Sequence, residues 1–227
     1  MMNKLEILNG PIFAPNKKPK KLVFMLHGYG DNADNFINIA NLLYNQDSKT
    51  NYLALNAPFA IPNYPMGRQW FNLYPNGIYI TNAQAKEKKI ILSEINIALK
   101  KLLNTINFFK KKFSLMSSDC FVLGFSQGGM MTFELGNFSL EKFGGLAILS
   151  GKILSEKIIQ NKIFLNTPLF ISHGSNDDVL TVDNFYQSCD FLKKNKFNFE
   201  KHLIKGDSHT ISSNAIDLLQ KFIKKNL

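Results

Sequence analysis

The sequence predicts an α/β fold in which helices cover both faces of a mostly parallel β-sheet. Short and continuously apolar segments recur along the chain, for example Leu-Val-Phe-Met-Leu at residues 22–26. Such segments are typical of strands that are buried on both faces of a sheet. Between them lie longer segments with apolar residues at helical spacing, for example Ile91, Ile95 and Ala98. This alternation indicates βαβ units, which build parallel sheets.

Turn signals and changes of periodicity divide the chain into elements. The expected strands are residues 5–8, 21–26, 52–56, 121–125, 143–149, 169–172 and 197–204. The expected helices are residues 34–44, 82–113 (as one helix or as two), 130–135, 181–194 and 211–225, with a partly helical segment from residue 155. In a sheet of this kind, functional sites lie beyond the carboxyl ends of the strands.

Residues 57–81 are expected to form a long irregular loop. They carry most of the nearby aromatic residues and are interrupted by Pro58, Pro62, Pro65 and Pro75. A loop of this length inside a compact domain is usually functional or mobile. We find no internal repeat and no domain boundary, and a length of 227 residues suits one α/β domain. Residues 1–227 are therefore expected to form a single domain.

The chain is basic, with a net charge of +10, which could suggest nucleic acid or an anionic membrane as a partner. The lysines fall in short clusters scattered along the sequence, mostly at expected helix ends and in loops. A lysine there is usually a solvated partner of the helix dipole. No nucleic-acid-binding motif accompanies them, so no nucleic-acid partner is expected.

The remaining composition favours a cytoplasmic location. No window approaches the ~20 apolar residues of a transmembrane helix. The amino-terminal residues lack the apolar region and cleavage site of a signal peptide. Cys120 and Cys189 lie in apolar surroundings and are expected to be buried, reduced thiols.

Ser126 is the candidate nucleophile. It lies in Gly124-Phe-Ser126-Gln-Gly128, between an apolar segment of strand character and an apolar segment at helical spacing. This strand–turn–helix context is that of a nucleophile elbow, in which crowded backbone excludes side chains two positions before and after the serine. The alternative is a glycine-rich turn between a strand and a helix that carries a serine without a catalytic role.

A serine hydroxyl needs a base within hydrogen-bond reach, and hydrolases with this elbow carry the acid and then the histidine downstream of the serine. The downstream candidates are His202 and His209. His202 lies inside an expected strand between polar neighbours on the same face, which indicates that it faces solvent. His209 follows that strand in a polar loop and is therefore the predicted base.

The acid is expected in the turn after the strand 169–172. Asp177 and Asp178 compete for the role, because either could orient the histidine while the other bonds loop amides or caps the next helix. Spacing slightly favours Asp177. Asp207 is close to His209 in sequence, but in that loop it is expected to bond the local backbone.

An oxyanion hole needs backbone N–H groups directed at the reacting carbonyl. The Gln127 amide is one candidate, and the Tyr29 amide in the glycine-containing loop after strand 21–26 is the other. Residues 28–33 also fit the dinucleotide pattern G-x-G-x-x-A, but the next strand ends without the acidic residue that would bind a ribose. No metal-binding motif occurs. Neither a cofactor nor a metal is therefore expected.

At this point the motifs support a family resemblance. The chain resembles the carboxylesterase/phospholipase family, which includes acyl-protein thioesterases, from about Lys21 to its C-terminus. The motifs that carry the resemblance, in family order, are Leu-His-Gly-Tyr-Gly-Asp at 26–31, Gly-Arg-Gln-Trp-Phe at 67–71, Gly-Phe-Ser-Gln-Gly-Gly-Met at 124–130, His-Gly-x-x-Asp at 173–177 and the late His209. Tyr29 stands where eukaryotic thioesterases tend to have Leu, so the chain looks closer to the bacterial esterase branch.

The resemblance implies an α/β-hydrolase fold without a large cap domain. It implies Ser126, Asp177 and His209 as the catalytic triad, which decides between the two aspartates, and the Tyr29 and Gln127 amides as the oxyanion hole. A homodimer is compatible with the family. The substrate would be a small-molecule ester or thioester, hydrolysed without a cofactor through an acyl-enzyme intermediate.

The expected function is hydrolysis of carboxylic esters or thioesters with small to medium acyl chains. Lysophospholipase or acyl-protein thioesterase activity at the same site is one alternative, and a non-catalytic ligand-binding protein of the same fold is another. The apolar side chains of the 57–81 loop are expected to bind the acyl chain, while Ile153 and Leu154 could line the opposite side. These loop residues are Tyr64, Met66, Trp70 and Phe71. Alternatively, the aromatic residues anchor the loop to the core.

Overall fold

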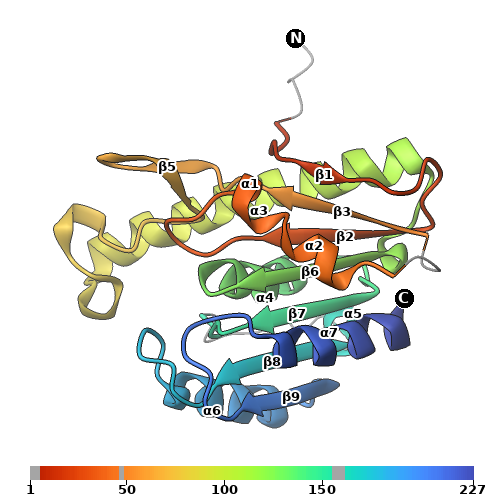
Figure 1. The fold of residues 1–227 in the computed structure, drawn as a ribbon. Helices are drawn as coiled ribbons and strands as arrows, with labels where there is room; N and C mark the ends of the chain where they lie inside the picture. Colours follow the sequence, from red (N-terminus) through yellow and green to blue (C-terminus); the bar gives the residue numbers. More distant parts are fainter. Residues whose placement is uncertain (1–5, 46–48, 155–161) are drawn as a thin grey trace.

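Residues 6–45, 49–154 and 162–227 are described in the computed structural model, and within them the main sheet has seven strands (Figure 1). In spatial order the strands are β1 (Ile12–Phe13), β3 (Thr50–Leu55), β2 (Lys21–Leu26), β6 (Cys120–Phe125), β7 (Gly145–Leu149), β8 (Leu169–Gly174) and β9 (Phe199–Ile204). All neighbouring pairs are parallel except β1 with β3, which is antiparallel. The expected α/β class with a mostly parallel sheet is confirmed.

Helices cover both faces of this sheet. One face carries α1 (Ala33–Phe36), α2 (Ile39–Leu43) and α7 (Ser213–Asn226), and the other carries α3 (Ala85–Phe113), α4 (Gln127–Phe138) and α6 (Val182–Lys194). A short helix, α5 (Lys162–Leu165), precedes β8. Among the described helices, none combines the length and the apolar composition that crossing a bilayer requires.

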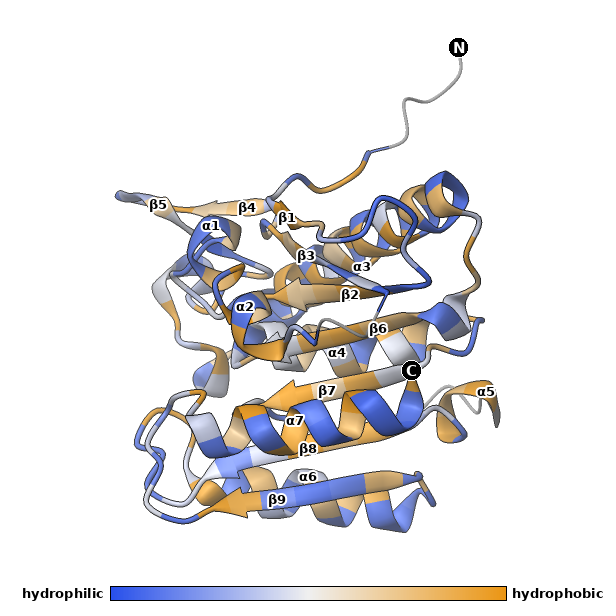
Figure 2. Ribbon diagram, turned by 45° about the vertical axis from the view of Figure 1, so that its right-hand side comes forward, coloured by the Kyte–Doolittle hydropathy of each residue, from blue (hydrophilic) through white to orange (hydrophobic). Residues whose placement is uncertain are grey.

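The strands explain why the core has two parts. Successive side chains of a strand point to opposite faces, so Phe24 packs with residues of α3 and α4 while Val23 and Met25 pack with residues of α1, α2 and α7. All three side chains are fully buried. Figure 2 shows the apolar character of the central strands and the alternating polar and apolar stripes of α7. Continuous apolar segments are thus required by a sheet that is covered twice.

The first strand is not where the sequence predicted it. Leu5 of the expected strand 5–8 lies outside the described residues, and residues 6–8 are not in a strand. Leu8 instead buries its side chain and donates its N–H to Thr105 Oγ1 at 2.8 Å. The chain joins the sheet only later, through β1. An apolar segment at a sheet edge can therefore cover the core without pairing as a strand.

The helix expected at 34–44 is divided into α1 and α2. Between them, the Asn38 side chain donates to the Asn35 carbonyl at 3.0 Å. The Ala40 N–H bonds the Ile37 carbonyl at 2.9 Å, which is a tighter i to i−3 turn. Asparagine side chains compete in this way for backbone groups that would otherwise continue a helix. In contrast, α3 runs unbroken over 29 residues, which decides between the one-helix and two-helix predictions for 82–113.

Residues 57–81 are not wholly irregular, as had been expected. They contain an antiparallel hairpin of β4 (Phe59–Ile61) and β5 (Tyr64–Gln69) that forms its own two-stranded sheet. The turn places Asn63 at a φ of 62°, a conformation that asparagine tolerates. A two-stranded sheet consists of edge strands, which accept proline more readily than central strands do, and this allows Pro65 within β5. The segment expected from residue 155 lies outside the described residues until α5.

Phe133 tests how much the core depends on its aromatic cluster. Its side chain is fully buried, and its ring centroid lies 5.1 Å from that of Phe164 and 5.8 Å from that of Phe197. We expect Phe133→Ala to lower the free energy of unfolding by about 3–5 kcal/mol in urea denaturation. The matched control is Phe108→Ala on α3, where a side chain that is 42% exposed should cost about 1 kcal/mol or less. Equal losses would contradict this description of the core.

Candidate active site

Ser126 lies on a strained turn between β6 and α4. Its φ is 52° and its ψ is −116°, a conformation that a residue with a side chain rarely adopts. The turn is fixed on both sides, because the Ser126 N–H donates to the Leu149 carbonyl at 2.8 Å and the Met130 N–H donates to the Ser126 carbonyl at 3.1 Å. The strain is thus held by the sheet and by the first turn of the helix.

The two glycines of the elbow are required by close backbone contacts. A Cβ atom at Gly124 would lie 2.1 Å from the Gly128 carbonyl oxygen. A Cβ atom at Gly128 would lie 2.1 Å from the Leu26 carbonyl oxygen. Gly129 has more room, since its nearest neighbour would be the Gly124 carbonyl oxygen at 3.0 Å. The helix therefore begins directly against the carboxyl end of β2, where only glycine fits.

His209 connects the serine to an acid. Its Nε2 atom lies 2.9 Å from Ser126 Oγ, and its Nδ1 atom lies 2.7 Å from Asp177 Oδ2. Because a carboxylate accepts a hydrogen bond, Nδ1 carries the proton and Nε2 is left to accept from the serine hydroxyl. The Phe125 ring packs against the imidazole with a centroid distance of 4.8 Å. This is the arrangement that activates a serine for nucleophilic attack.

Asp177 is the acid that the structure brings to the histidine. Its side chain is fully buried, and its second oxygen, Oδ1, accepts from the N–H groups of Val179 at 3.0 Å and Leu180 at 2.8 Å. The carboxylate is thus oriented by its own loop. Asp178, the sequence competitor, is exposed.

The other sequence candidates lie apart from the serine. His202 was predicted from the sequence to face solvent. It is instead half-buried and packs on Phe170 with a centroid distance of 5.0 Å. Asp207 contributes its main-chain carbonyl, which accepts from the Asn176 N–H at 2.8 Å.

His173 is a site residue that sequence reasoning left without a role. Its Nε2 atom lies 2.6 Å from the Leu180 carbonyl oxygen and 3.2 Å from Asp177 Oδ2, and its side chain is fully buried. The carbonyl can only accept, so Nε2 carries the proton and directs it toward both oxygens. The signal was present in the His-Gly-x-x-Asp motif, which carries the histidine four residues before the acid.

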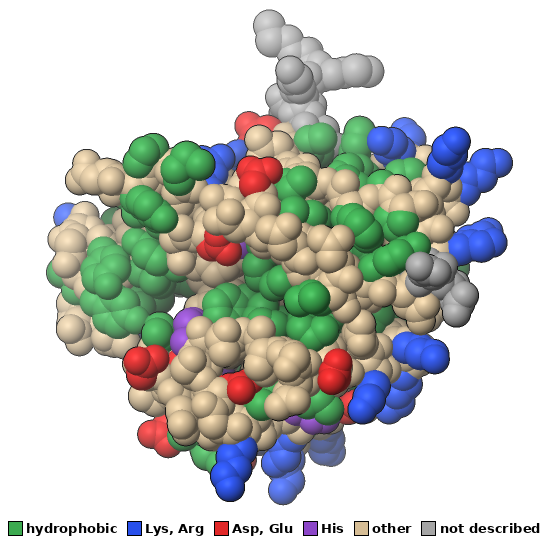
Figure 3. Space-filling view, viewed as in Figure 1, with side chains coloured by type: hydrophobic (Ala, Val, Ile, Leu, Met, Phe, Trp, Pro, Cys, Tyr) green, Lys and Arg blue, Asp and Glu red, His purple; other side chains and the backbone are tan. Residues whose placement is uncertain are grey.

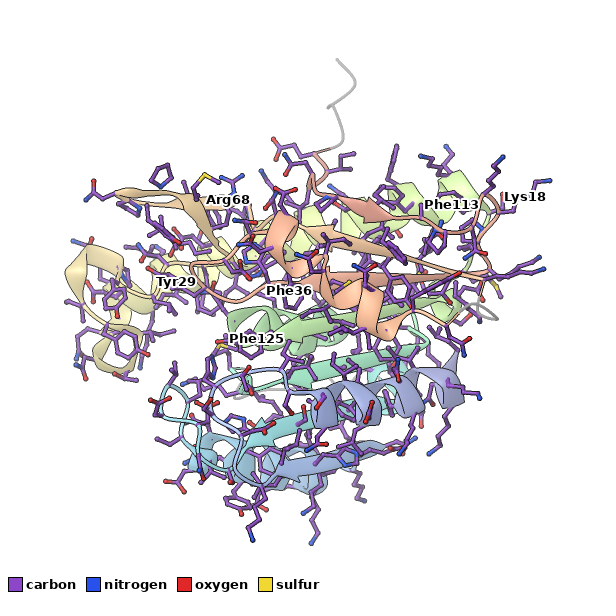
Figure 4. The ribbon with its side chains drawn as sticks, viewed as in Figure 1. Lys18, Tyr29, Phe36, Arg68, Phe113 and Phe125 are labelled. Atoms are coloured by element: carbon purple, nitrogen blue, oxygen red, sulfur yellow. The ribbon has the colours of Figure 1, made fainter. Side chains whose placement is uncertain are left out.

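The two amides predicted for an oxyanion hole belong to segments next to the nucleophile. The Gln127 N–H is the first of α4, and the Tyr29 loop adjoins the elbow, because a Cβ atom at Gly28 would lie 3.5 Å from Ser126 Cβ. Neither N–H donates to a protein acceptor among the described residues. Tyr29 and Phe125 lie toward the same end of the sheet in Figure 4. Two free donors beside the serine can bind a developing negative charge.

The His27 ring holds the loop that carries Tyr29. Its Nδ1 atom lies 2.7 Å from the Gly28 carbonyl oxygen, and its Nε2 accepts from the Ala57 N–H at 3.1 Å. These partners require the neutral form with the proton on Nδ1. Burial lowers the pKa of His27 below its usual value, although the bond to Gly28 opposes this. The Trp70 indole N–H also donates to the His27 carbonyl at 2.9 Å.

Trp70 and Phe71 do not line an open acyl pocket. Both are fully buried in the core between the sheet and α3. The Gln127 side chain links them to the elbow, since it accepts from the Trp70 N–H at 2.8 Å and donates to the Phe71 carbonyl at 2.7 Å. The expectation that these rings contact the substrate is therefore replaced by its alternative, in which they anchor the loop.

The other predicted pocket residues are more accessible. Tyr64 and Met66 on β5 are 51% and 70% exposed. Ile153 and Leu154 are half-buried and line a cavity of about 310 Å³ beside α6. The space-filling view shows a hollow on the left-hand side of the molecule, with hydrophobic side chains on both sides and a histidine at its edge (Figure 3).

Among the described residues, neither a metal-binding cluster nor a reactive cysteine accompanies the serine. Among them, no three His, Cys, Asp or Glu side chains are placed to hold a metal ion. Burial raises the pKa of Cys120 to about 12 and that of Cys189 to about 11. Both cysteines therefore stay protonated at neutral pH and are poor nucleophiles.

Comparisons with known proteins show what this chain is similar to. Residues 9–227 match the model of a family described as phospholipase/carboxylesterase. Acyl-protein thioesterase 1 of Debaryomyces hansenii is 28% identical over 232 residues, covering 94% of this chain and 96% of the relative. The crystal structure of esterase PE8 superposes with a TM-score of 0.81 at 25% identity, covering 97% of this chain and all of that one. Arabidopsis thaliana SOBER1, at 23% identity and a TM-score of 0.75 over 91% of this chain and 98% of that one, shares the fold.

His27 gives a prediction for the pH dependence of stability. Its pKa is lowered from 6.5 by burial, so the unfolded chain binds more protons and the stability that depends on the neutral ring is lost as the pH falls below 6.5. In His27→Gln the amide offers one donor and one acceptor but does not titrate. We expect the free energy of unfolding to fall less steeply between neutral and mildly acidic pH in this variant. His202 supplies the control. Burial lowers its pKa as well, but its side chain is 28% exposed, so His202→Gln should change that slope less. The prediction fails if His27→Gln and wild type give the same slope.

Proposed function

Because this chain belongs to the phospholipase/carboxylesterase family, we propose that it cleaves carboxylic esters or thioesters of small to medium acyl chains as a serine hydrolase. The observation that carries the proposal is the hydrogen-bonded series from Ser126 through His209 to Asp177 on a strained turn. Relatives named acyl-protein thioesterase and probable carboxylesterase support the same class of reaction. The catalytic roles of the individual residues are part of the proposal.

Acylation begins when Ser126 Oγ attacks the carbonyl carbon of the substrate. His209 Nε2 accepts the hydroxyl proton, and Asp177 stabilises the resulting imidazolium. The carbonyl oxygen becomes an oxyanion that accepts hydrogen bonds from the Tyr29 and Gln127 N–H groups. When the tetrahedral intermediate collapses, the bond to the leaving group breaks, and the alcohol or thiol takes the proton from His209.

Deacylation repeats these steps with water as the nucleophile. His209 accepts a proton from the water, whose oxygen attacks the acyl-enzyme carbonyl. The same amides bind the second oxyanion. Collapse breaks the bond to Ser126 Oγ, which recovers its proton from His209, and the carboxylic acid leaves. Neither step requires a cofactor.

The β4–β5 hairpin is the proposed acyl-binding wall. Its backbone bonds the loop that carries Tyr29, because the Gly30 N–H donates to the Arg68 carbonyl and the Arg68 N–H donates to the Asp31 carbonyl, both at 3.0 Å. Exposed Tyr64 and Met66 on the same hairpin supply apolar surface. Lysophospholipase and acyl-protein thioesterase activities are alternatives at the same site. The cytoplasmic location, the single-domain organisation and the homodimer also stay predictions.

Replacing the nucleophile tests the proposal most simply. We expect Ser126→Ala to lower kcat/KM on p-nitrophenyl esters by about 10⁴-fold or more, because only binding and the oxyanion amides remain. Alanine keeps the Cβ atom that makes the positive φ unfavourable, so the strain is unchanged and the melting temperature should change little. Ser93→Ala, on the exposed face of α3, is the matched control and should leave the rate unchanged. Near-full activity of Ser126→Ala, or no activity in wild type on esters and acyl-CoA thioesters of graded length, would contradict the assignment.

The neighbouring aspartates provide an independent test. Asp177→Asn should lower kcat by about 10⁴-fold, because an amide at this position favours the wrong tautomer of His209. Asp178→Asn changes the same charge at the next residue, but that side chain is exposed, and we expect a rate within about twofold of wild type. Similar rates for the two variants in the same ester assay would remove Asp177 from the mechanism.

A further inference from the structure

The lysine clusters that are scattered in the sequence lie at one end of the folded molecule. Parallel strands begin at a common edge of the sheet, and each connecting helix ends near that edge before the next strand. The C-terminal ends of α3, α6 and α7 and the residues just before β2, β3 and β7 therefore lie along this edge. We call this the basic end; its lysines are Lys17, Lys18, Lys20, Lys21, Lys49, Lys110, Lys111, Lys112, Lys142, Lys193, Lys194, Lys196, Lys221, Lys224 and Lys225.

Most of this charge is not neutralised by neighbouring acids. Lys21 pairs with Asp119 at 3.0 Å, Lys110 with Glu141 at 2.5 Å and Lys225 with Glu200 at 2.6 Å. The other lysines of the basic end are exposed and form no ion pair with a described residue. Figure 3 shows Lys and Arg side chains along the right-hand side and the lower edge. Figure 4, in the same view, labels Lys18 on the right-hand side and Tyr29 on the left.

Two aliphatic side chains protrude among these lysines. Met116 is 68% exposed and Leu140 is 78% exposed, which makes them among the most exposed large apolar side chains of the described chain. Their loops adjoin each other, because Ser117 donates a hydrogen bond to the Glu141 carboxylate and Lys110 bonds both residues. Exposed apolar tips next to unpaired lysines are the pattern of proteins that bind a membrane surface.

The basic end also contains a cavity of about 940 Å³ between the β2–β3 edge and the C-terminus of α7. Apolar side chains form part of its wall, and lysines surround them. The apolar members are Leu43, Tyr44, Tyr52, Ile223 and Leu227, and the lysines are Lys20, Lys21, Lys49, Lys221 and Lys224. A cavity with this lining suits an amphiphile that carries negative charge beside an apolar part.

We propose that the basic end docks this protein on an anionic lipid bilayer. The unpaired lysines face the headgroup charge, Met116 and Leu140 insert between headgroups, and the cavity receives an anionic headgroup with the adjoining part of its chain. Ser126 lies at the carboxyl ends of the strands, so the docked protein presents its site to water. Docking therefore does not depend on the proposed hydrolytic function.

The exposed chemistry favours a bilayer over nucleic acid. Direct reading of bases relies mainly on arginine, asparagine and glutamine, and Arg68 is located on the hairpin at the opposite end. Binding of single strands relies on aromatic side chains on which bases stack. The side chains that protrude most between the lysines are aliphatic instead.

Vesicle co-sedimentation tests the proposal. We expect the protein to pellet with vesicles of phosphatidylcholine and phosphatidylglycerol, to stay in solution with phosphatidylcholine alone, and to be released by salt, because salt screens charges on exposed groups. The charge variant combines Lys111→Glu, Lys142→Glu and Lys224→Glu and should weaken binding at least tenfold. The matched control reverses Lys86, Lys88 and Lys89 to Glu, an equal change at the other end of α3, and should keep wild-type binding.

A second variant tests insertion without changing the charge. Met116→Ser with Leu140→Ser should weaken binding several-fold, whereas Leu92→Ser, at a side chain that is 59% exposed on α3, should not. Melting temperatures check that each variant is folded. Equal binding to neutral and anionic vesicles, equal binding by the two charge variants, or displacement of the vesicles by a single-stranded RNA bound more tightly would overturn the proposal.

Discussion

The strained turn at Ser126 is the constraint on which the rest of the site depends. A positive φ at a residue with a side chain persists only where the surrounding structure leaves no other conformation. Here the sheet fixes the turn through the Leu149 carbonyl, and the backbone of α4 approaches β6 and β2 so closely that only glycine fits at 124 and 128. The position of the hydroxyl is thus a consequence of how β2, β6 and α4 pack.

The same parallel topology creates two chemically different ends. Loops after β2, β6, β8 and β9 bring the Tyr29 amide, a serine, an aspartate and a histidine to the carboxyl edge of the sheet. Helix ends and strand starts bring lysines to the opposite edge. Two buried side chains join the loops at the carboxyl edge to one another. The Gln127 side chain bonds the Trp70–Phe71 backbone, and the His27 ring bonds Gly28 and Ala57.

Features encoded by local pattern could be predicted from the sequence, and features that depend on distant contacts could not. The apolar strands and the glycines around Ser126 are local, and they led to the correct sheet and turn. Spacing left Asp177 and Asp178 in competition, because burial of one and exposure of the other depend on the His209 loop. Burial of Trp70 depends on contacts between segments far apart in sequence, among them the bond of its N–H to the Gln127 side chain. The lysines seemed scattered because their common edge exists only in the fold.

The most direct measurement of the central claim is covalent labelling with a fluorophosphonate, in which an activated serine oxygen displaces fluoride from phosphorus. If the turn, His209 and Asp177 activate the hydroxyl as proposed, intact mass should increase by one phosphonyl group, and peptide analysis should locate it on Ser126. Labelling should be abolished in folded Asp177→Asn protein and retained in Asp178→Asn. A folded wild-type protein that stays unlabelled, or that carries the group on another residue, would contradict the account.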